Sequence, residues 1–178
     1  MTHIALLRGI NVGGRNRLSM ADLVRLFEEA GAKRVRTYIQ SGNVVFDALS
    51  ARAGRLAATV SAAIAAQIGP EVPIVTRTAA DLARIVDASP FARAGTDLKL
   101  LHVGFLAACP AATAIAALDP DRSPPDEFAL RNRELYLRCP NGMARTKLTS
   151  AYFDATLKTV TTIRNWRTTL KLLEMVGA

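Results

Sequence analysis

The chain has 178 residues and a mass of 19.1 kDa; half of its residues are hydrophobic and 21% are charged. This length fits one domain or two small domains packed together, and the composition excludes collagen, coiled coils and intrinsic disorder. No apolar run approaches the ~20 residues that a membrane-spanning helix needs, so we expect a soluble protein that makes no membrane contact.

The charge balance favours an anionic partner. Lys and Arg number 23 against 15 Asp and Glu, which gives a formal net charge of +8 and an isoelectric point near 10.2. The excess of bases lies in residues 1–50 and 131–178, and most of the bases are Arg, whose planar guanidinium group suits phosphate or carboxylate. The abundance of Arg beside Ala also fits a chain encoded by a GC-rich genome, so composition alone leaves both explanations open.

Cysteine and histidine are scarce. The cysteines are Cys109 and Cys139, and the histidines are His3 and His102. No Cys-x-x-Cys or His-x-x-x-His spacing occurs, so we expect no metal site and no cofactor. Neither cysteine has a histidine or a basic cluster close to it in sequence, which predicts that both are buried apolar residues rather than nucleophiles. The N-terminus lacks the pattern of a signal peptide, and we expect a cytoplasmic protein.

The first half is predicted to form six elements. A short apolar strand at 4–8 comes first, and a helix capped by Ser19 and Asp22 runs from there to Gly31. The remaining elements are the strands of a hairpin at 35–40 and 43–47, a helix with apolar residues every four positions up to Gly69, and a strand at 72–76. The order is β-α-β-β-α-β.

The second half nearly repeats this order after a linking helix capped by Thr78 and Asp81. We predict a strand at 98–107, a short helix at 111–118, a hairpin at 127–130 and 135–139, a helix at 150–157 and a final helix at 165–176.

These patterns predict an α+β fold of two tandem ferredoxin-like subdomains (split βαβ, or α–β plait) that pack together. The N-terminal subdomain is expected at 1–77, and the C-terminal subdomain, with an extra C-terminal helix, at 78–178. The strands at 4–8 and 100–106 have apolar side chains on both faces, so each sheet should be covered on both faces. We expect helices on one face and the other half of the chain on the opposite face.

The loop after the first strand carries the most informative motif. Residues 8–17 read RGINVGGRNR and lead into the helix capped by Ser19. Phosphate sites are often built from a strand, a glycine-bearing loop and a helix N-terminus, because glycine lets backbone N–H groups approach the ligand. The motif is neither G-x-x-x-x-G-K-[ST] nor G-x-G-x-x-G, and a tight turn with solvated arginines is the simpler alternative. The candidate ligand-binding residues are Arg8, Asn11, Gly13, Gly14, Arg15, Asn16 and Arg17.

A second loop also places bases ahead of a helix. Arg145 and Lys147 precede the helix predicted to begin near Ser150. Helix N-termini favour acids by ~0.3–1 kcal/mol, so bases there carry a small cost that a bound anion would reverse. Neighbouring Asp22 and Asp154 could instead offset that cost at the two loops as ordinary surface ion pairs. We expect anion binding at both loops.

The predicted hairpin adds a polar strand face. Arg36, Tyr38 and Gln40 alternate along that face and lead into Ser41 and Asn43 at the turn. These five residues are candidates for ligand binding, and a solvated sheet face is the simpler alternative.

The final helix adds a basic face. Arg164, Arg167 and Lys171 are predicted to lie away from Trp166, which we expect in the core. Arg164 and Asn165 join the candidate binding residues, although an ordinary exposed helix face explains the pattern more simply.

Three strings resemble a bacterial family catalogued only as domain of unknown function 1697. They are residues 5–14 (ALLRGINVGG), 36–46 (RTYIQSGNVVF) and 162–173 (TIRNWRTTLKLL). The resemblance spans nearly the whole chain and implies a cytoplasmic α+β protein with two plait-like subdomains. It implies no activity, substrate, cofactor or catalytic residue.

Three functions remain open at this point. The first is a binding module for a phosphate-bearing ligand or nucleic acid, in which the two basic loops converge where the halves meet. The second is an enzyme acting on a phosphorylated small molecule, with Arg8, Asn11, Tyr38, Gln40 and Asn43 lining a cleft; its catalytic residues are unknown, because paired carboxylates and a Ser-His-Asp order are absent. The third is a protein–protein interaction module whose basic ends meet an acidic partner. The oligomeric state is left open.

Overall fold

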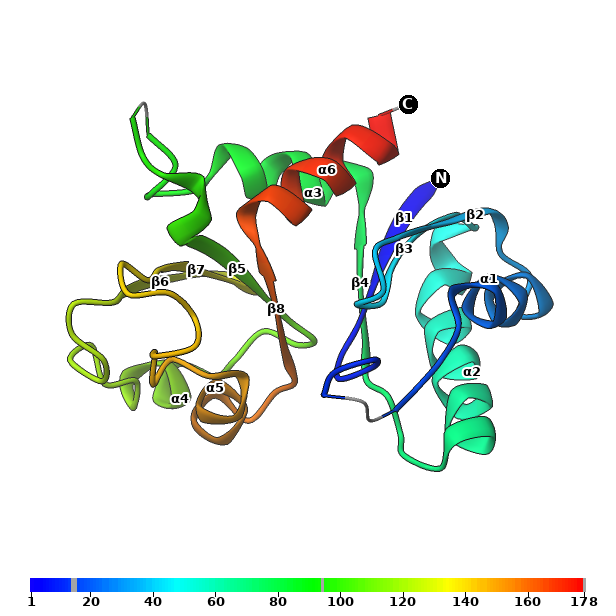
Figure 1. Ribbon diagram of the computed structural model, residues 1–178, viewed down its shortest axis with the longest axis horizontal. Helices are drawn as coiled ribbons and strands as arrows, with labels where there is room; N and C mark the ends of the chain where they lie inside the picture. The colour runs from blue at the N-terminus through cyan, green and yellow to red at the C-terminus, as the bar shows by residue number, and fades with distance from the viewer. Residues whose placement is uncertain (14–15, 94, 178) are drawn as a thin grey trace. The chain divides into compact units, whose positions relative to one another are not determined.

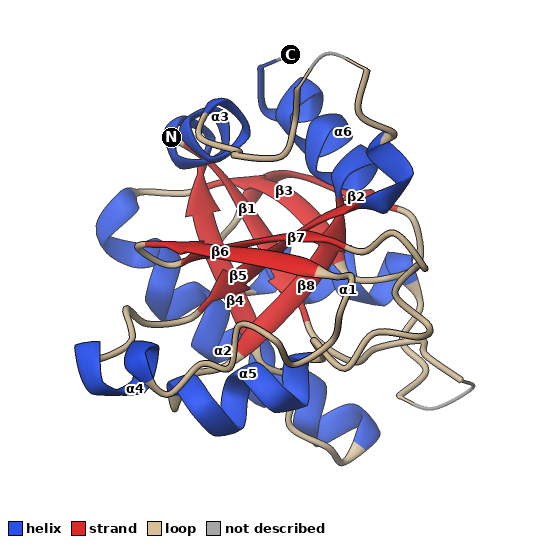
Figure 2. Cartoon of the chain, turned by 90° about the vertical axis from the view of Figure 1, so that its left-hand side faces the viewer, coloured by secondary structure: helices blue, strands red, loops and turns tan. Residues whose placement is uncertain are grey.

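A computed structural model describes residues 1–13, 16–93 and 95–177 of the chain (Figure 1). The chain divides into two compact units, one comprising residues 1–83 with 172–178 and the other comprising residues 84–171. Each unit contains a four-stranded antiparallel sheet, and the described residues also form six α-helices. The fold class is therefore α+β, as Figure 2 illustrates with strands and helices in separate colours.

The first unit is built on a sheet of order β2-β3-β1-β4. In this sheet Leu6 of β1 pairs with Asn43 on one side and with Val75 on the other. The elements in chain order are β1 (Thr2–Leu7), α1 (Met20–Glu29), β2 (Lys33–Tyr38), β3 (Asn43–Asp47), α2 (Ser50–Ile68) and β4 (Ile74–Thr78), followed by α3 (Ala79–Asp87), which continues into the second unit.

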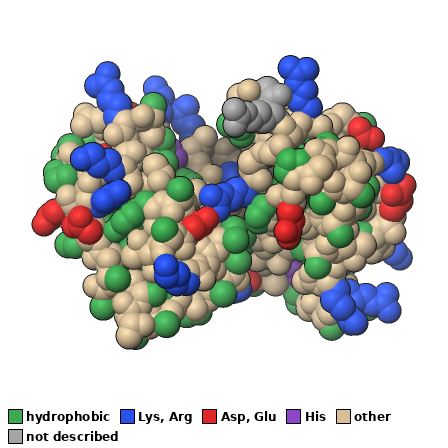
Figure 3. Space-filling model, turned by 90° about the horizontal axis from the view of Figure 1, so that it is seen from below, with side chains coloured by type: hydrophobic (Ala, Val, Ile, Leu, Met, Phe, Trp, Pro, Cys, Tyr) green, Lys and Arg blue, Asp and Glu red, His purple; other side chains and the backbone are tan. Residues whose placement is uncertain are grey.

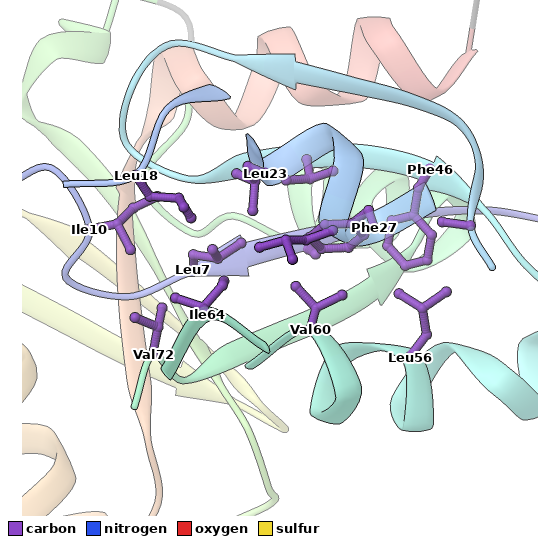
Figure 4. Packing of buried hydrophobic residues seen from close by; sticks show 14 residues of the cluster. Leu7, Ile10, Leu18, Leu23, Phe27, Phe46, Leu56, Val60, Ile64 and Val72 are labelled. Carbon is purple, nitrogen blue, oxygen red and sulfur yellow. The ribbon is translucent and has the colours of Figure 1, made fainter. Parts of the chain in front are cut away.

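The core of the first unit lies between its sheet and two helices. Helices α1 and α2 lie on the same side of the sheet, and their apolar stripes contact alternate residues of β1 and β3 (Figure 1). Figure 4 labels ten members of this cluster, which are Leu7, Ile10, Leu18, Leu23, Phe27, Phe46, Leu56, Val60, Ile64 and Val72. The predicted four-residue spacing of α2 is confirmed, because that spacing turns one helix face toward the sheet.

Both predicted helix caps are confirmed, and the one at Thr78 is a reciprocal capping box. The Ser19 hydroxyl accepts a hydrogen bond from the Asp22 N–H at 3.0 Å and donates one to the Asp22 carboxylate at 2.6 Å. At the start of α3 the Thr78 hydroxyl accepts from the Asp81 N–H at 3.0 Å, while the Asp81 carboxylate accepts from the Thr78 N–H at 3.1 Å. These bonds satisfy backbone donors that a helix cannot satisfy itself, which explains why the helices begin there.

The second unit has a sheet of order β6-β7-β5-β8. Helices α4 and α5 lie on one side of it (Figure 2), where Phe153 and Leu157 of α5 pack with Leu135 and Leu137 of β7. The elements in chain order are a 3-10 turn (Leu98–Leu100), β5 (Leu101–Leu106), α4 (Ala112–Ala116), β6 (Glu127–Arg131), β7 (Glu134–Arg138), α5 (Ser150–Leu157), β8 (Thr161–Asn165) and α6 (Trp166–Gly177).

The structure differs from the sequence prediction at two places in this unit. The predicted strand at 98–107 begins only at Leu101, because the Asp97 side chain accepts from the Lys99 N–H at 3.0 Å and caps a 3-10 turn. Strand β8 was not predicted, and it pairs with β5 along its whole length. The idea that each half covers the second face of the other's sheet stays a prediction.

Two buried histidines predict a loss of stability in mild acid. His3 Nε2 and His102 Nδ1 are buried without a hydrogen-bond partner, and burial lowers the pKa of both imidazoles from the ordinary 6.5. Because the unfolded chain binds these protons more readily, stability should fall as the pH drops from 6.5 through the folded pKa values. Calorimetric Tm should be lower at pH 5 than at pH 7.5.

A double variant isolates this effect. His3→Phe with His102→Leu should flatten the dependence of Tm on pH between 7.5 and 5, since the pKa values of Asp22 and Asp47 are lowered, away from this pH range. An unchanged slope in the double variant would show that other groups cause it.

Candidate functional site

Asn11 holds together the loop that follows β1. Its side-chain amide N–H groups donate to the carbonyl oxygens of Leu18 and Gln40, both at 2.9 Å, and its amide oxygen accepts from the Leu18 N–H at 2.9 Å. The backbone φ of Asn11 is +54°, a region that asparagine tolerates better than most residues. The Asn11 side chain therefore ties the loop at 8–18 to the hairpin turn after β2, and its amide is engaged by the backbone.

The rest of this loop is shaped by residues with positive φ. Gly9 has φ +75°, Gly13 has φ +57° and Asn16 has φ +50°. The Asn16 amide donates to the Gly9 carbonyl at 2.8 Å, which closes the loop on itself. Two of the predicted site residues, Gly14 and Arg15, lie outside the described residues.

Arg17 lies at the edge of an open hollow of about 440 Å³ at the start of α1. The hollow is lined by Asn11, Arg17, Leu18, Ser19 and Gln40. Arg17 is exposed, and within the described part of the chain its side chain makes no hydrogen bond or ion pair. Ser19 also lines the hollow, although the sequence predicts it only as a helix cap. Its position close to the basic loop, immediately before α1, is the signal that could have identified it as a site residue.

Asp22 does not neutralise Arg17. Its carboxylate accepts from the Ser19 hydroxyl and lies 3.5 Å from Arg25 on the next turn of α1. The hydrogen bond from the Ser19 hydroxyl and, to a smaller extent, the guanidinium of Arg25 hold the pKa of the Asp22 carboxyl below its ordinary value. The possibility that Asp22 offsets the bases of this loop as an ion pair is therefore not realised for Arg17.

The hairpin turn after β2 is fixed by Asn43. The side chain of Asn43 is fully buried, and its amide donates to the Tyr38 carbonyl at 3.1 Å and to the Ser41 hydroxyl at 3.0 Å. The predicted strand to residue 40 ends at Tyr38, because Ile39 takes a left-handed φ of +50° and turns outward, half exposed. Gln40 is exposed beside it, with its carbonyl held by Asn11.

Arg8 and Arg36 are placed differently from Arg17. The Arg8 side chain is half-buried, and its backbone N–H donates to the Pro73 carbonyl at 3.0 Å. Arg36 and Tyr38 do share one face of β2, as predicted, since they pair with Val45 and Asn43. The Arg36 guanidinium, however, donates to the Met175 carbonyl at 2.6 Å, so it is occupied at the last turn of α6.

The second basic loop belongs to the second unit. Arg145 and Lys147 are exposed, and their side chains make no hydrogen bond or ion pair with any described residue. Thr149 caps α5 by accepting from the Tyr152 N–H at 3.2 Å, which confirms the predicted hydroxyl cap. Asp154, named above as a possible partner, accepts from the Thr161 N–H at 2.7 Å.

Ser123 supports this loop from a distance in sequence. Its hydroxyl oxygen accepts from the Lys147 N–H at 3.0 Å and its hydroxyl donates to the Asp126 carboxylate at 2.8 Å. Thr146 is buried beside it and accepts from the Leu148 N–H at 3.0 Å. The sequence carries no local signal for this pairing, because Ser123 and Lys147 are 24 residues apart.

Arg164 does not lie on a helix face, so its predicted place on the basic face of the final helix is wrong. Arg164 belongs to β8, where its guanidinium donates to the Thr162 hydroxyl at 2.9 Å and to the Ile163 carbonyl at 3.1 Å. Burial lowers the pKa of Arg164 to about 10. The Asn165 amide oxygen accepts from the Thr168 N–H at 2.8 Å and so caps α6, while Trp166 is buried in the core as expected.

The cysteines differ from one another. Cys139 is buried as predicted, in contact with Met143, and burial raises the pKa of its thiol to about 11. Cys109 is exposed, so its predicted burial is wrong; it follows the end of β5 in a surface loop. Within residues 1–13, 16–93 and 95–177, no three His, Cys, Asp or Glu side chains gather as a metal site would require.

On the face drawn in Figure 3, Lys and Arg side chains lie at several separate places among hydrophobic and uncharged residues.

The fold defines an α+β protein of two units, each with a four-stranded antiparallel sheet. The chain belongs to the family described as protein of unknown function (DUF1697), whose model matches residues 1–136. No curated protein matches its sequence. None of the helices described is both long and apolar enough to cross a membrane.

A solved structure has the same fold. The conserved bacterial protein SP0830 from Streptococcus pneumoniae superposes with a TM-score of 0.73 at 21% sequence identity, over 99% of this chain and 98% of that chain. At this identity the likeness extends to the fold alone.

Proposed function

We propose that the chain is a binding module for a phosphate-bearing ligand or nucleic acid, held at the basic loops that precede α1 and α5. The observation that carries this proposal is Arg17, an exposed cation beside the hollow at the start of α1 whose side chain has no ion-pair partner among the described residues. A cation at a helix N-terminus is unfavourable unless an anion lies between them, so a bound phosphate would turn a cost into a gain.

The hydrogen bonds of the loop support preorganisation of this site. Asn11, Asn16 and Asn43 use their amides to fix the backbone around the hollow, so their role in the proposal is to hold the loop. A loop that is already ordered loses less entropy when it binds a ligand. Gly13 and Arg17 are then the described residues that would contact the anion, together with the exposed Gln40.

The loop before α5 supports a second contact of the same kind. Arg145 and Lys147 are exposed and have no ion-pair partner in the part of the chain that the structure describes, and Ser123 holds the backbone of Lys147. The variants below test the two loops independently.

A thermal-shift screen with nucleotides and sugar phosphates tests the proposal. A ligand at a hundred times its Kd should stabilise the chain by ~2.7 kcal/mol. Arg17→Gln should abolish the shift from a ligand bound at the loop before α1, and Arg145→Gln with Lys147→Gln should abolish the shift from a ligand bound at the loop before α5. Arg55→Gln is the matched control, because Arg55 is an exposed base on α2 away from the hollow.

Nucleic acid is the polymeric version of the ligand. The affinity of the chain for nucleic acid should fall steeply as the salt concentration rises. On duplex DNA, the logarithm of the binding constant should fall with the logarithm of the salt concentration by ~0.9 per neutralised phosphate. No gel shift with DNA or RNA, together with no thermal shift from any phosphate compound, would leave the proposal without support.

The proposal favours binding over catalysis. Of the five residues in the enzyme hypothesis, Asn11 and Asn43 have their amides engaged by backbone and hydroxyl groups. No observation on the remaining residues singles out a general acid or base.

Two finer features of the protein belong to the same proposal. We infer that each unit is ferredoxin-like, because the sheet orders β2-β3-β1-β4 and β6-β7-β5-β8 arise from the same β-α-β-β-α-β sequence of elements.

We also infer a cytoplasmic location in a bacterium, supported by the family resemblance and by two cysteines that are both free.

A further inference from the structure

Strand β6 is an open edge of the second sheet. It pairs only with β7, in a register that places Phe128 opposite Leu137. Among the described residues, no other segment forms a backbone hydrogen bond with residues 127–131. In an antiparallel pair, alternate residues direct N–H and C=O groups away from the partner strand, so the outer side of β6 presents unpaired donors and acceptors.

A hollow of about 550 Å³ lies beside this edge, within the second unit. Its lining comprises residues 127–129 of β6, the aromatic ring of Phe91, four prolines and the acidic residues Asp121 and Asp126. Phe91 and Phe128 are both half-buried, so their rings are partly accessible. This volume and this mainly apolar lining are typical of sites that accept a side chain or small ligand.

The charge of the hollow is opposite to that of the whole chain. No Lys or Arg is among its lining residues, although the chain has a net charge of +8. Glu127 is paired with Arg138 at 2.6 Å, but neither Asp121 nor Asp126 makes an ion pair with a described residue. One oxygen of Asp126 accepts from the Ser123 hydroxyl, and the other is buried without a partner. An unneutralised carboxylate that is partly desolvated favours a cation nearby.

We propose that β6 binds an extended, basic segment of a partner protein by strand addition, with a Lys or Arg side chain of that segment entering the hollow. Main-chain hydrogen bonds to an open edge supply affinity, and a pocket for alternate side chains supplies specificity. Alternate residues of an added strand face the same side, so bases at every second position would meet the hollow together. The phenyl rings and prolines would contact the aliphatic part of the basic side chain.

Three acetylated and amidated peptides test the proposal: TVRVRVT, its acidic counterpart TVEVEVT, and TVRVRVT with alternate backbone nitrogens methylated. Isothermal titration calorimetry should detect binding of the first. N-methylation should weaken binding by roughly tenfold or more, since each lost hydrogen bond costs ~0.5–1.5 kcal/mol. Hydrogen exchange should slow at the amides of β6.

Variants locate the contact. Asp121→Asn should weaken binding of TVRVRVT by roughly two- to fivefold, as expected for a partly exposed charge pair. Glu28→Gln is the matched control on α1 of the first unit and should have no effect. The proposal is overturned if TVRVRVT does not bind, if TVEVEVT binds equally well, if N-methylation is harmless, or if protection appears away from β6.

Discussion

Replacing Gly42 by alanine should lower the free energy of unfolding by about 2–5 kcal/mol. Gly42 has a φ of +74°, and an added Cβ would lie 2.7 Å from the Cβ of Leu7 and 2.9 Å from the Cδ1 of Ile10. The left-handed backbone costs an alanine roughly 1–2 kcal/mol, and overpacking of a core costs about 1–3 kcal/mol more. The Gly42 carbonyl also accepts from the Leu7 N–H, so a shift of the turn disturbs β1.

Denaturant unfolding measures this change, and Gly54 supplies the control. Gly54 lies inside α2, where an added Cβ meets nothing within 4 Å. Gly54→Ala should therefore stabilise the chain by up to about 1 kcal/mol, the difference in helix propensity. Substitutions at an unconstrained surface position usually change stability by less than ~0.5 kcal/mol. If Gly42→Ala changed stability by no more than that amount, the close packing of the turn would be refuted.

Replacing Asn11 by alanine should cost about 4 kcal/mol of stability, of which ~1 kcal/mol comes from the left-handed backbone, and most of the affinity for a phosphate ligand. The change removes three hydrogen bonds, each worth ~1 kcal/mol, that tie the loop to Leu18 and Gln40. Because Asn11 holds the backbone of Leu18, the loss of its amide would free the neighbouring backbone of Arg17 beside the hollow. Thermal unfolding and the phosphate titration measure the two effects.

Asn132 provides the matched control for Asn11. It has nearly the same backbone conformation, with a φ of +55°, in the turn between β6 and β7, but its side chain makes no hydrogen bond with any described residue. Asn132→Ala should cost only the backbone term of about 1 kcal/mol. Equal losses in the two variants would mean that the Asn11 amide contributes nothing.

Most of the fold could be predicted because its elements carry local signals. The caps at Ser19 and Thr78 and the four-residue spacing of α2 act within a few positions of the chain, so sequence alone locates them. The sequence prediction lacks strand β8, although its Thr161–Asn165 segment follows Val160 and is rich in β-branched residues. It assigns no element to residues 158–164 and counts Arg164 with a face of the following helix.

The candidate site could be predicted less completely, since its contacts are long-range. The pattern of bases before a helix correctly indicates that Arg17 is exposed. The hydrogen bond that occupies Arg36, however, goes to the Met175 carbonyl, 139 positions away in the sequence. Likewise, Ser123 supports the loop of Lys147 only through the folded backbone. Spacing identifies residue types, whereas pairing in space decides which of them remain available to a ligand.

A titration of the 15N-labelled chain with pyrophosphate tests the central claim most directly. The amide signals of Arg17, Leu18 and Ser19 should shift and saturate, and Arg17→Gln should remove the effect while Arg55→Gln preserves it. Signals at the start of α1 that stay fixed at every pyrophosphate concentration, or shifts that persist in Arg17→Gln, would contradict an anion site there.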